Sequence, residues 1–248
     1  MTPRILVLRA PGTNCDVETS HAFTLAGGEP TVLHLNRWLE APKLADDYQI
    51  LCLPGGFSYG DDVAAGRIFA NQLQHHLADS LKSFREAGKL ILGICNGFQV
   101  LIKSGLLDHE EENGPTETLD WNESGRFIDR WVNLQADDSR CVFLKGIDRL
   151  YLPIAHAEGR FATTDEATFE KLVAKGQLAL RYADGDNPNG ATGDVAGMTD
   201  ESGRVFGLMP HPERFVDRTQ HPRWTRTPDL PEEGAGLAVF LNAVNYFK

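Results

Sequence analysis

The sequence contains no unbroken run of the roughly 18 apolar residues that a membrane-spanning helix requires. Its N-terminal apolar run soon meets Arg9, and no small-residue cleavage site of a signal peptide follows that run. These two absences argue against a membrane partner and against export. We therefore expect a cytoplasmic protein.

Cationic residues are scarce relative to anionic ones. Lys and Arg number 24 whereas Asp and Glu number 35, so the formal net charge is −11 at pH 7. Because nucleic-acid binding depends on Lys and Arg contacts to phosphates, this balance argues against a nucleic-acid partner. Hydrophobic residues at 42% and charged residues at 24% are typical of a globular chain, which argues against a disordered, collagenous or coiled-coil protein.

Cysteine is also sparse. The four cysteines, at positions 15, 52, 95 and 141, are far apart and form no C-x-x-C pair. This spacing favours neither a disulfide framework nor a zinc site, and we predict no metal site. We interpret Cys52 as a buried structural residue of an apolar strand, and Cys15 and Cys141 as structural or incidental.

The remaining sequence alternates short apolar runs with helical patterns. Nearly continuous apolar runs are typical of parallel strands covered on both faces, and strands separated by helices indicate right-handed βαβ units. We predict one α/β domain over residues 1–248 with a mixed sheet. The predicted strands are Arg4–Arg9, Thr31–Leu35, Gln49–Leu53, Lys89–Ile94, Trp131–Leu134, Cys141–Leu144, Tyr151–Ile154, Leu178–Tyr182 and Val205–Met209. The predicted helices are Asp16–Leu25, Ile68–Ala87, Glu166–Ala174 and Gly236–Phe247.

Three stretches depart from this alternation. Residues 108–125 are acidic and interrupted by Gly and Pro, and residues 217–234 are rich in Pro and charge. Residues 184–194 contain many turn-forming residues. We predict surface excursions for the first two stretches and a loop for the third.

Residues 93–97, G-I-C-N-G, fit the pattern G-x-nucleophile-x-G at the junction of an apolar strand and a helix. Gly93 and Gly97 remove Cβ atoms that would collide in so tight a turn. The N-terminus of the following helix favours a thiolate at Cys95. We therefore predict that Cys95 is a nucleophile; the alternative is a buried structural cysteine at a strand end.

A thiolate nucleophile needs a proton donor for its leaving group and an orienting partner for that donor. His211 and Glu213 lie two residues apart, so in extended chain their side chains point to the same side. Pro210 and Pro212 stiffen the segment, which follows a predicted strand. We predict that His211 and Glu213 complete the catalytic set; the alternative is a rigid surface loop with an incidental histidine.

Backbone N–H groups must also stabilise the oxyanion that forms during the reaction. The N–H of Asn96, directly after the nucleophile, is the first expected donor. The turn L-P-G-G-F at 53–57 ends a neighbouring strand, and Gly56 there is the second candidate. The alternative is an ordinary strand-terminating turn.

Together these motifs resemble the class I (triad) glutamine amidotransferases. The resemblance rests on P-G-G-F at 54–57, G-I-C-N-G-F-Q at 93–99 and M-P-H-P-E-R at 209–214. Within that family, G-G-F-S-Y-G-D at 55–61, H-A-E-G-R-F at 156–161 and N-P-N-G at 187–190 are most similar to glutaminase subunits that serve de novo purine synthesis. The resemblance runs from about Arg4 to Phe247. It implies a single flavodoxin-like domain, with a mostly parallel central sheet, helices on both faces and extra antiparallel strands.

The resemblance implies a chemistry for each motif. Cys95 attacks the side-chain amide of glutamine and forms a thioester, while the Gly56 and Asn96 N–H groups hold the oxyanion. His211 protonates the departing ammonia and then activates water, and Glu213 orients His211.

The resemblance further implies that Gln99 contacts the glutamine substrate and that Phe127 lines its site. It also implies a synthetase partner that takes the ammonia and converts formylglycinamide ribonucleotide to formylglycinamidine ribonucleotide, with a small third subunit as a possible further partner. ATP and Mg²⁺ are expected on the synthetase, and no cofactor is expected in this chain. The sequence agrees, because it lacks the P-loop pattern G-x-x-x-x-G-K-[ST].

Two other functions stay open at this point. Deglycase-like or peptidase-like proteins also carry a cysteine elbow, but they usually place a histidine after the cysteine, where this chain has Asn96. A catalytically silent docking module on the same fold is the other alternative. His156 and Arg160 could line an ammonia exit or a partner interface, or serve the structure alone, and we assign no chemistry to Asp61 and Asp62.

Overall fold

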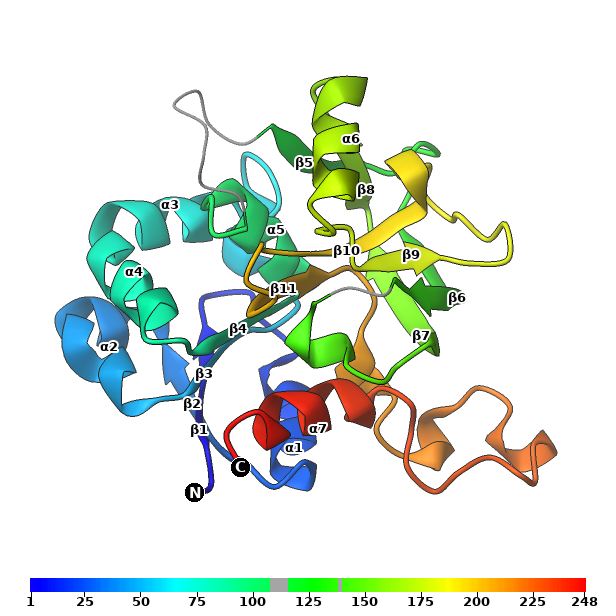
Figure 1. Ribbon diagram of the computed structural model, residues 1–248, viewed down its shortest axis with the longest axis horizontal. Helices are drawn as coiled ribbons and strands as arrows, with labels where there is room; N and C mark the ends of the chain where they lie inside the picture. The colour runs from blue at the N-terminus through cyan, green and yellow to red at the C-terminus, as the bar shows by residue number, and fades with distance from the viewer. Residues whose placement is uncertain (108–115, 138–139) are drawn as a thin grey trace.

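The computed structural model describes residues 1–107, 116–137 and 140–248. Within these ranges nine strands form one sheet in the order β2-β1-β3-β4-β11-β10-β9-β6-β7, and two strands form a separate pair (Figure 1). The nine are β1 (Arg4–Arg9), β2 (Glu29–His34), β3 (Ile50–Leu53), β4 (Leu90–Ile94), β6 (Ile128–Ala136), β7 (Arg149–His156), β9 (Leu180–Tyr182), β10 (Val195–Thr199) and β11 (Val205–Leu208). The pair is β5 (Glu117–Trp121) and β8 (Glu158–Thr163). The helices are α1 (Asp16–Leu25), α2 (Leu35–Glu40), α3 (Arg67–His76), α4 (Ala78–Glu86), α5 (Asn96–Lys103), α6 (Glu166–Ala174) and α7 (Leu237–Asn245).

The sheet has a parallel part and an antiparallel part. Strands β2, β1, β3, β4 and β11 pair in parallel, and β10, β9, β6 and β7 extend the sheet in antiparallel fashion. Every residue of β3 and β4 is buried, because α1 and α7 cover one side of these strands and α3 and α5 the other (Figure 1). The prediction of an α/β fold with helices on both faces and added antiparallel strands is confirmed.

The parallel strands bring four loops to one edge of the sheet. The carboxyl ends of β1, β3, β4 and β11 lead into residues 10–15, 54–57, Cys95 and 209–213, respectively. In open α/β sheets ligands bind at this edge, next to the point where the strand order reverses. Here the order reverses around β1, which lies between β2 and β3.

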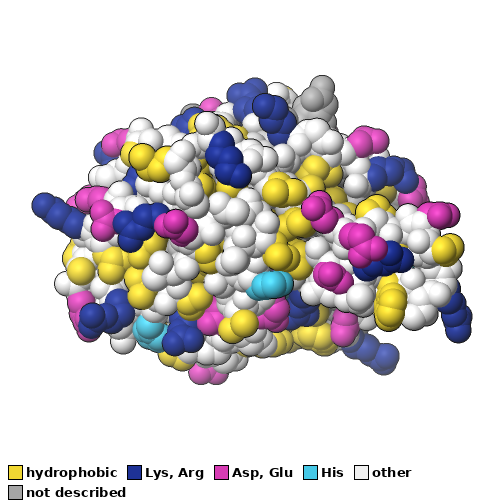
Figure 2. All heavy atoms as spheres, turned by 90° about the horizontal axis from the view of Figure 1, so that it is seen from below, with side chains coloured by type: hydrophobic (Ala, Val, Ile, Leu, Met, Phe, Trp, Pro, Cys, Tyr) yellow, Lys and Arg dark blue, Asp and Glu magenta, His cyan; other side chains and the backbone are white. Residues whose placement is uncertain are grey.

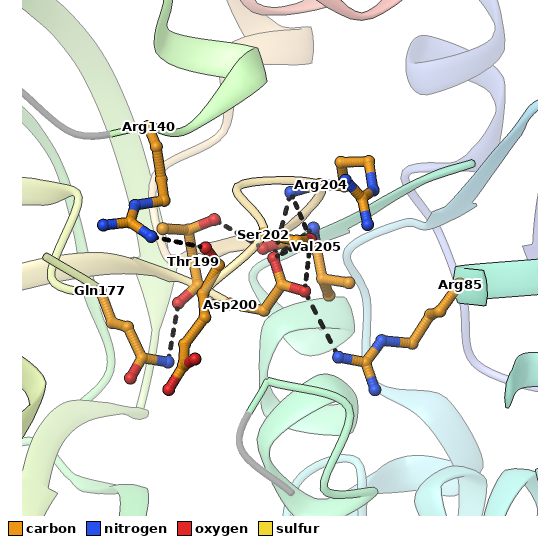
Figure 3. A network of polar contacts seen from close by, with 9 residues as sticks. Arg85, Arg140, Gln177, Thr199, Asp200, Ser202, Arg204 and Val205 are labelled. Carbon is orange, nitrogen blue, oxygen red and sulfur yellow. Dashed lines mark hydrogen bonds and ion pairs between the residues drawn. The ribbon is translucent and has the colours of Figure 1, made fainter. Parts of the chain in front are cut away.

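The opposite edge is fixed by a buried carboxylate (Figure 3). Asp200, between β10 and β11, accepts the backbone N–H groups of Arg204 at 3.0 Å and Val205 at 3.1 Å. Its carboxylate also accepts the Ser202 hydroxyl at 2.7 Å and an Arg85 N–H at 3.3 Å. These bonds hold the start of β11 beside β4 and α4, and β11 leads on to the loop that carries His211.

Two predicted elements are wrong. The single helix Ile68–Ala87 is two helices, α3 and α4, because the backbone leaves the helical region at Leu77 (φ −125°, ψ 11°) while its side chain stays buried. The predicted strand Cys141–Leu144 is a 3-10 turn over Val142–Leu144. The Phe143 ring packs in the core against Phe206, and Asn242 Nδ2 donates to the Phe143 carbonyl at 2.9 Å, so this apolar segment is held in the core as a turn.

The predicted surface excursion over residues 108–125 has an ordered part. Residues 108–115 lie outside the described residues, but Glu117–Trp121 forms β5 and pairs with β8. The patterns also missed α2, β8 and β10.

The face seen in Figure 2 carries acidic and basic side chains side by side, so the net negative charge is not gathered into one patch there. Among the described residues, none of the helices has both the length and the hydropathy to cross a membrane.

Candidate active site

Cys95 occupies a strained turn between β4 and α5. Its φ of 51° lies in the left-handed region that residues with a side chain rarely adopt. The turn is possible because both flanking glycines lack a Cβ. A Cβ on Gly93 would lie 2.6 Å from the Gly97 carbonyl oxygen, and one on Gly97 would lie 1.9 Å from the Leu53 carbonyl oxygen.

The sulfur of Cys95 lies at the N-terminus of α5 and is nearly buried, with the residue 5% exposed. Its Sγ lies 3.8 Å from the carbonyl oxygen of Ala155 on β7. Two residues earlier in that strand, the carbonyl oxygen of Pro153 accepts the backbone N–H of His211 at 2.8 Å. One antiparallel strand therefore contacts both the predicted nucleophile and the predicted base.

His211 and Glu213 form a buried pair. His211 Nδ1 lies 2.6 Å from Glu213 Oε1, and both side chains are at most 2% exposed. The extended backbone expected for this segment is wrong, because Pro212–Arg214 forms a 3-10 turn, yet that turn brings the two side chains together. This bond leaves Nε2, the other ring nitrogen, buried and without a hydrogen-bond partner among the described residues.

The surroundings of His211 favour its protonated form. Burial lowers the pKa of His211, but the nearby Glu213 carboxylate raises it, and so do the nearby sulfurs of Cys95 and Cys15. The net pKa lies well above the ordinary value. The groups around His211 therefore favour an imidazolium over the neutral ring.

The turn that contains Gly56 is held by the loop after β1. The backbone N–H groups of Asn14 and Cys15 donate to the Gly55 carbonyl oxygen at 3.3 Å and 3.2 Å. In a trans peptide the carbonyl and the following N–H point in opposite directions, so the Gly56 N–H points away from this loop. Gly56 has a φ of 145°, and a Cβ there would lie 2.7 Å from the Asn14 nitrogen, so glycine is required.

Asn96 and Gln99 lie in one buried hydrogen-bond network. Asn96 Nδ2 donates to Gln99 Oε1 at 2.9 Å, and Gln99 Nε2 donates to the Glu158 carbonyl oxygen. Asn96 Nδ2 also donates to Asp61 Oδ1 at 3.2 Å. Burial, and then repulsion from Glu158, raises the pKa of Asp61 to about 6. The sequence analysis assigned Asp61 no chemistry, although it belongs to the same run as Gly56.

Phe127 lies at the rim of this edge. Half of it is exposed, and its ring centroid lies 6.3 Å from that of Phe57, the residue after Gly56. The structure therefore places Phe127 beside the predicted oxyanion turn.

His156 and Arg160 are both engaged within the chain. His156 Nδ1 lies 3.0 Å from Asn122 Oδ1, and burial together with nearby His211 lowers its pKa to about 4. Arg160 Nη2 donates to Asp120 Oδ2 at 2.6 Å. Both residues brace the β7–β8 segment, next to the predicted base.

Cys15 and Arg214 lie near His211, and the sequence patterns gave neither a role, although Arg214 ends the motif at 209–214. Cys15 Sγ accepts an N–H from the Arg214 guanidinium at 3.1 Å. Potential metal-ligating atoms of Cys15, His211 and Glu213 lie within 4.8 Å of one another, but the last two are already bonded to each other. The only signal in the sequence was the position of Cys15 just after a predicted parallel strand, where active-site loops gather.

Two cavities are lined by none of the predicted site residues. A cavity of about 610 Å³ opens at the other edge of the sheet, around Arg85 and Asp200, and contains none of the predicted site residues. A second cavity of about 540 Å³ lies beside the α5 helix, lined in part by Lys103, Trp121 and Glu158.

A cysteine on a strained strand-to-helix turn, facing a buried histidine–carboxylate pair at the carboxyl edge of a parallel sheet, defines a cysteine-dependent acyl-transfer enzyme. A family profile for the CobB/CobQ-like glutamine amidotransferase domain matches residues 2–247, so the chain belongs to that family. It is a class I glutamine amidotransferase, as its motifs indicated.

Several proteins of similar length are similar in sequence to this chain over nearly its whole length. The phosphoribosylformylglycinamidine synthase subunit PurQ of Dehalococcoides mccartyi is 48% identical, covering 98% of this chain and 97% of the relative. The subunit of the same name from Methanococcus maripaludis is 41% identical, and the match covers 100% of this chain and 98% of the relative. A chain in the PurLQS structure from Thermotoga maritima is 37% identical, with a TM-score of 0.78 and full coverage of both chains.

Proposed function

We propose that this chain is the glutaminase subunit of phosphoribosylformylglycinamidine synthase. It hydrolyses glutamine and passes the ammonia to an ATP-dependent synthetase, which converts formylglycinamide ribonucleotide to formylglycinamidine ribonucleotide in purine synthesis. The observation that carries the glutaminase activity is the placement of His211 between Glu213 and Cys95. The full-length similarity to PurQ subunits supports this particular amidotransferase.

The proposed reaction has two stages. The Cys95 thiolate attacks the side-chain carbonyl carbon of glutamine, and the N–H groups of Gly56 and Asn96 hold the resulting oxyanion. Each such donor is worth about 2.7–4 kcal/mol in comparable enzymes. As the C–N bond breaks, His211 gives its proton to the departing nitrogen, which leaves as ammonia and leaves a thioester on Cys95.

The second stage returns the enzyme to its starting state. Neutral His211 takes a proton from water, whose oxygen attacks the thioester carbonyl. The C–S bond breaks, glutamate leaves and the Cys95 thiolate again faces a protonated His211. Glu213 holds the imidazole through Nδ1 in both stages, so its other nitrogen can face the reacting atoms.

Gln99 and Phe127 are the proposed substrate contacts. Gln99 lies one helical turn from Cys95 and is held by Asn96, which fixes the direction of its amide. Phe127 and Phe57 lie together at the rim, where apolar rings could close over the aliphatic part of glutamine.

The proposed partner is the synthetase subunit, with a small third subunit as a further candidate. The PurLQS structure that contains a similar chain supports such an assembly. Several large apolar side chains stay exposed, as a docking face would require: Phe57, Val63 and Phe127 on loops, and Trp121 at the end of β5. ATP and Mg²⁺ are proposed to bind the synthetase, with no cofactor in this chain.

We also propose that residues 1–248 form one domain and that the protein works in the cytoplasm. The domain proposal is supported by the sheet, which joins strands from β1 to β11, and by the packing of α7 against α1. The proposed compartment is supported by the four cysteines, none of which forms a disulfide among the described residues, as is usual in a reducing environment.

Mass spectrometry after treatment with a diazoketone analogue of glutamine tests the proposed function. The expected result is a single adduct on Cys95 whose formation is suppressed by excess glutamine. Labelling of another cysteine alone, or labelling that glutamine does not suppress, would contradict the assignment. Cys52 and Cys141, which are equally buried, serve as internal controls.

A further inference from the structure

Cys15 lies at the centre of the active-site edge although no motif points to it. It ends the loop after β1 and directly precedes α1, and it is fully buried. Its backbone N–H donates to the Gly55 carbonyl oxygen at 3.2 Å, so its main chain helps to fix the turn of Gly56. Its main chain is therefore anchored to the turn that presents a proposed oxyanion donor.

The sulfur of Cys15 has polar neighbours on several sides. It accepts an N–H from Arg214 at 3.1 Å, and its own thiol donates to Asn14 Oδ1 at 3.2 Å. A Cβ placed on Gly55 would lie 3.2 Å from this sulfur and 2.9 Å from His211 Cε1. The His211 imidazole and the Cys15 sulfur thus both lie close to the position that a Cβ of Gly55 would occupy.

Cys52, another buried cysteine, has different surroundings. Burial and repulsion from Glu213 raise its pKa, and neither cause is a cation. In contrast, Cys15 is one of the groups that raise the pKa of both Arg214 and His211, against the lowering caused by burial. The Cys15 sulfur therefore favours the protonated forms of His211 and Arg214, in addition to packing in the core.

We propose that Cys15 is a positioning residue of the glutaminase reaction, whose sulfur holds the His211 imidazole and the Arg214 guanidinium in place beside Cys95. This inference rests on the proposed glutaminase function. Cys15 Sγ lies within 4.8 Å of a ring nitrogen of His211, and Glu213 holds the same ring through Nδ1. The imidazole is thereby held by two groups from distant parts of the chain, and its position relative to Cys95 becomes fixed.

The charge of His211 depends on every titratable group that faces it. These groups are Glu213 from its own loop, Cys95 from the elbow, Cys15 from the β1 loop and His156 from the end of β7. Removal of the Cys15 sulfur deletes one contribution that favours the imidazolium. We therefore expect the pKa of His211 to fall towards its ordinary value.

The test compares Cys15→Ala and Cys15→Ser with Cys141→Ala as a matched loss of a buried thiol. NMR titration of ¹³C-labelled histidine reports the pKa of His211 in the intact chain, and glutamine turnover is measured in the complex with the synthetase. Cys15→Ala should lower the His211 pKa and reduce kcat by about tenfold to a hundredfold, while KM for glutamine stays near the parent value. Cys15→Ser should recover part of both losses, because a hydroxyl can also accept from Arg214.

The alkaline limb of the kcat profile gives a second readout. His211 must carry a proton to release ammonia, so activity falls as the pH rises through its pKa, and Cys15→Ala should move this limb to lower pH. An unchanged His211 pKa and pH profile in folded Cys15→Ala, even with a lower Tm, would overturn the proposal. If Cys15→Ala does not fold, Cys15→Ser decides: a smaller shift in the same direction supports the proposal, and no shift overturns it. The titration needs no glutamine, so it tests Cys15 even if the proposed function fails.

Discussion

Asn96, the residue after the nucleophile, is hydrogen-bonded to Ser58 and Asp61 in the loop after the oxyanion turn. Its Oδ1 accepts the Ser58 N–H at 3.2 Å, and its Nδ2 donates to Asp61 Oδ1 at 3.2 Å. The side chain of Asn96 thus joins the two elements whose backbone N–H groups are the proposed oxyanion donors. Asn96→Ala keeps its own backbone donor but releases residues 58–61. We expect a lower kcat with a folded protein, measured by glutaminase assay and circular dichroism. An unchanged kcat would show that this bridge is not needed.

Asp61 should make stability depend on pH in the acidic range. Its pKa is raised from 3.8 to about 6 by burial and by Glu158, so its protonated form is favoured in the folded state. The resulting stabilisation is full below the unfolded pKa and is lost as the pH rises from about 4 to about 6. Asp61→Asn should therefore lose less stability than the parent over this interval, as measured by urea unfolding at a series of pH values. Asp62→Asn is the exposed neighbouring control and should follow the parent.

Glu213→Gln should impair His211 as the catalytic base, although glutamine has nearly the same shape as glutamate. The amide cannot supply the negative charge that raises the pKa of His211, and it no longer selects the proper tautomer. We expect kcat to fall by about 10²- to 10⁴-fold, with the alkaline limb moved to lower pH. Steady-state kinetics across pH tests this expectation. A loss confined to KM would argue that Glu213 binds substrate instead.

Gly97→Ala should damage the fold of the elbow. A Cβ at this position would lie 1.9 Å from the Leu53 carbonyl oxygen, and backbone cannot yield as a flexible side chain can. The matched control is Gly88→Ala, because Gly88 has a φ of 72° and no atom within 4 Å of its Cβ position. The control should lose only about 1–2 kcal/mol from the left-handed backbone, and Gly97→Ala clearly more. Equal losses in denaturant unfolding would contradict the crowding seen at Gly97.

The elbow could be predicted from the sequence because its determinants are local. Gly93, Cys95 and Gly97 lie within five residues at a strand–helix boundary, and the close approach of Gly93 to the Gly97 carbonyl oxygen lies within that turn. The pairing of His211 with Glu213 was also local, although the backbone between them is a 3-10 turn and not extended.

The rest of the site depends on contacts between distant segments. Cys15 meets Arg214 across 199 positions of sequence, and β7 supplies the carbonyl groups of Pro153 and Ala155 from an antiparallel strand whose place in the sheet no local pattern specifies. The break between α3 and α4 at Leu77 could not be predicted from the apolar spacing, because this spacing continues through Leu77 although the backbone leaves the helical region there.

The central claim is that the Cys95 sulfur is the nucleophile that releases ammonia for a partner synthetase. The most direct measurement is product formation by the complex containing Cys95→Ala, with either glutamine or ammonium chloride as the nitrogen source. We expect no glutamine-dependent synthesis and an ammonium-dependent rate equal to that of the parent complex. Glutamine-dependent synthesis at the parent rate would contradict it.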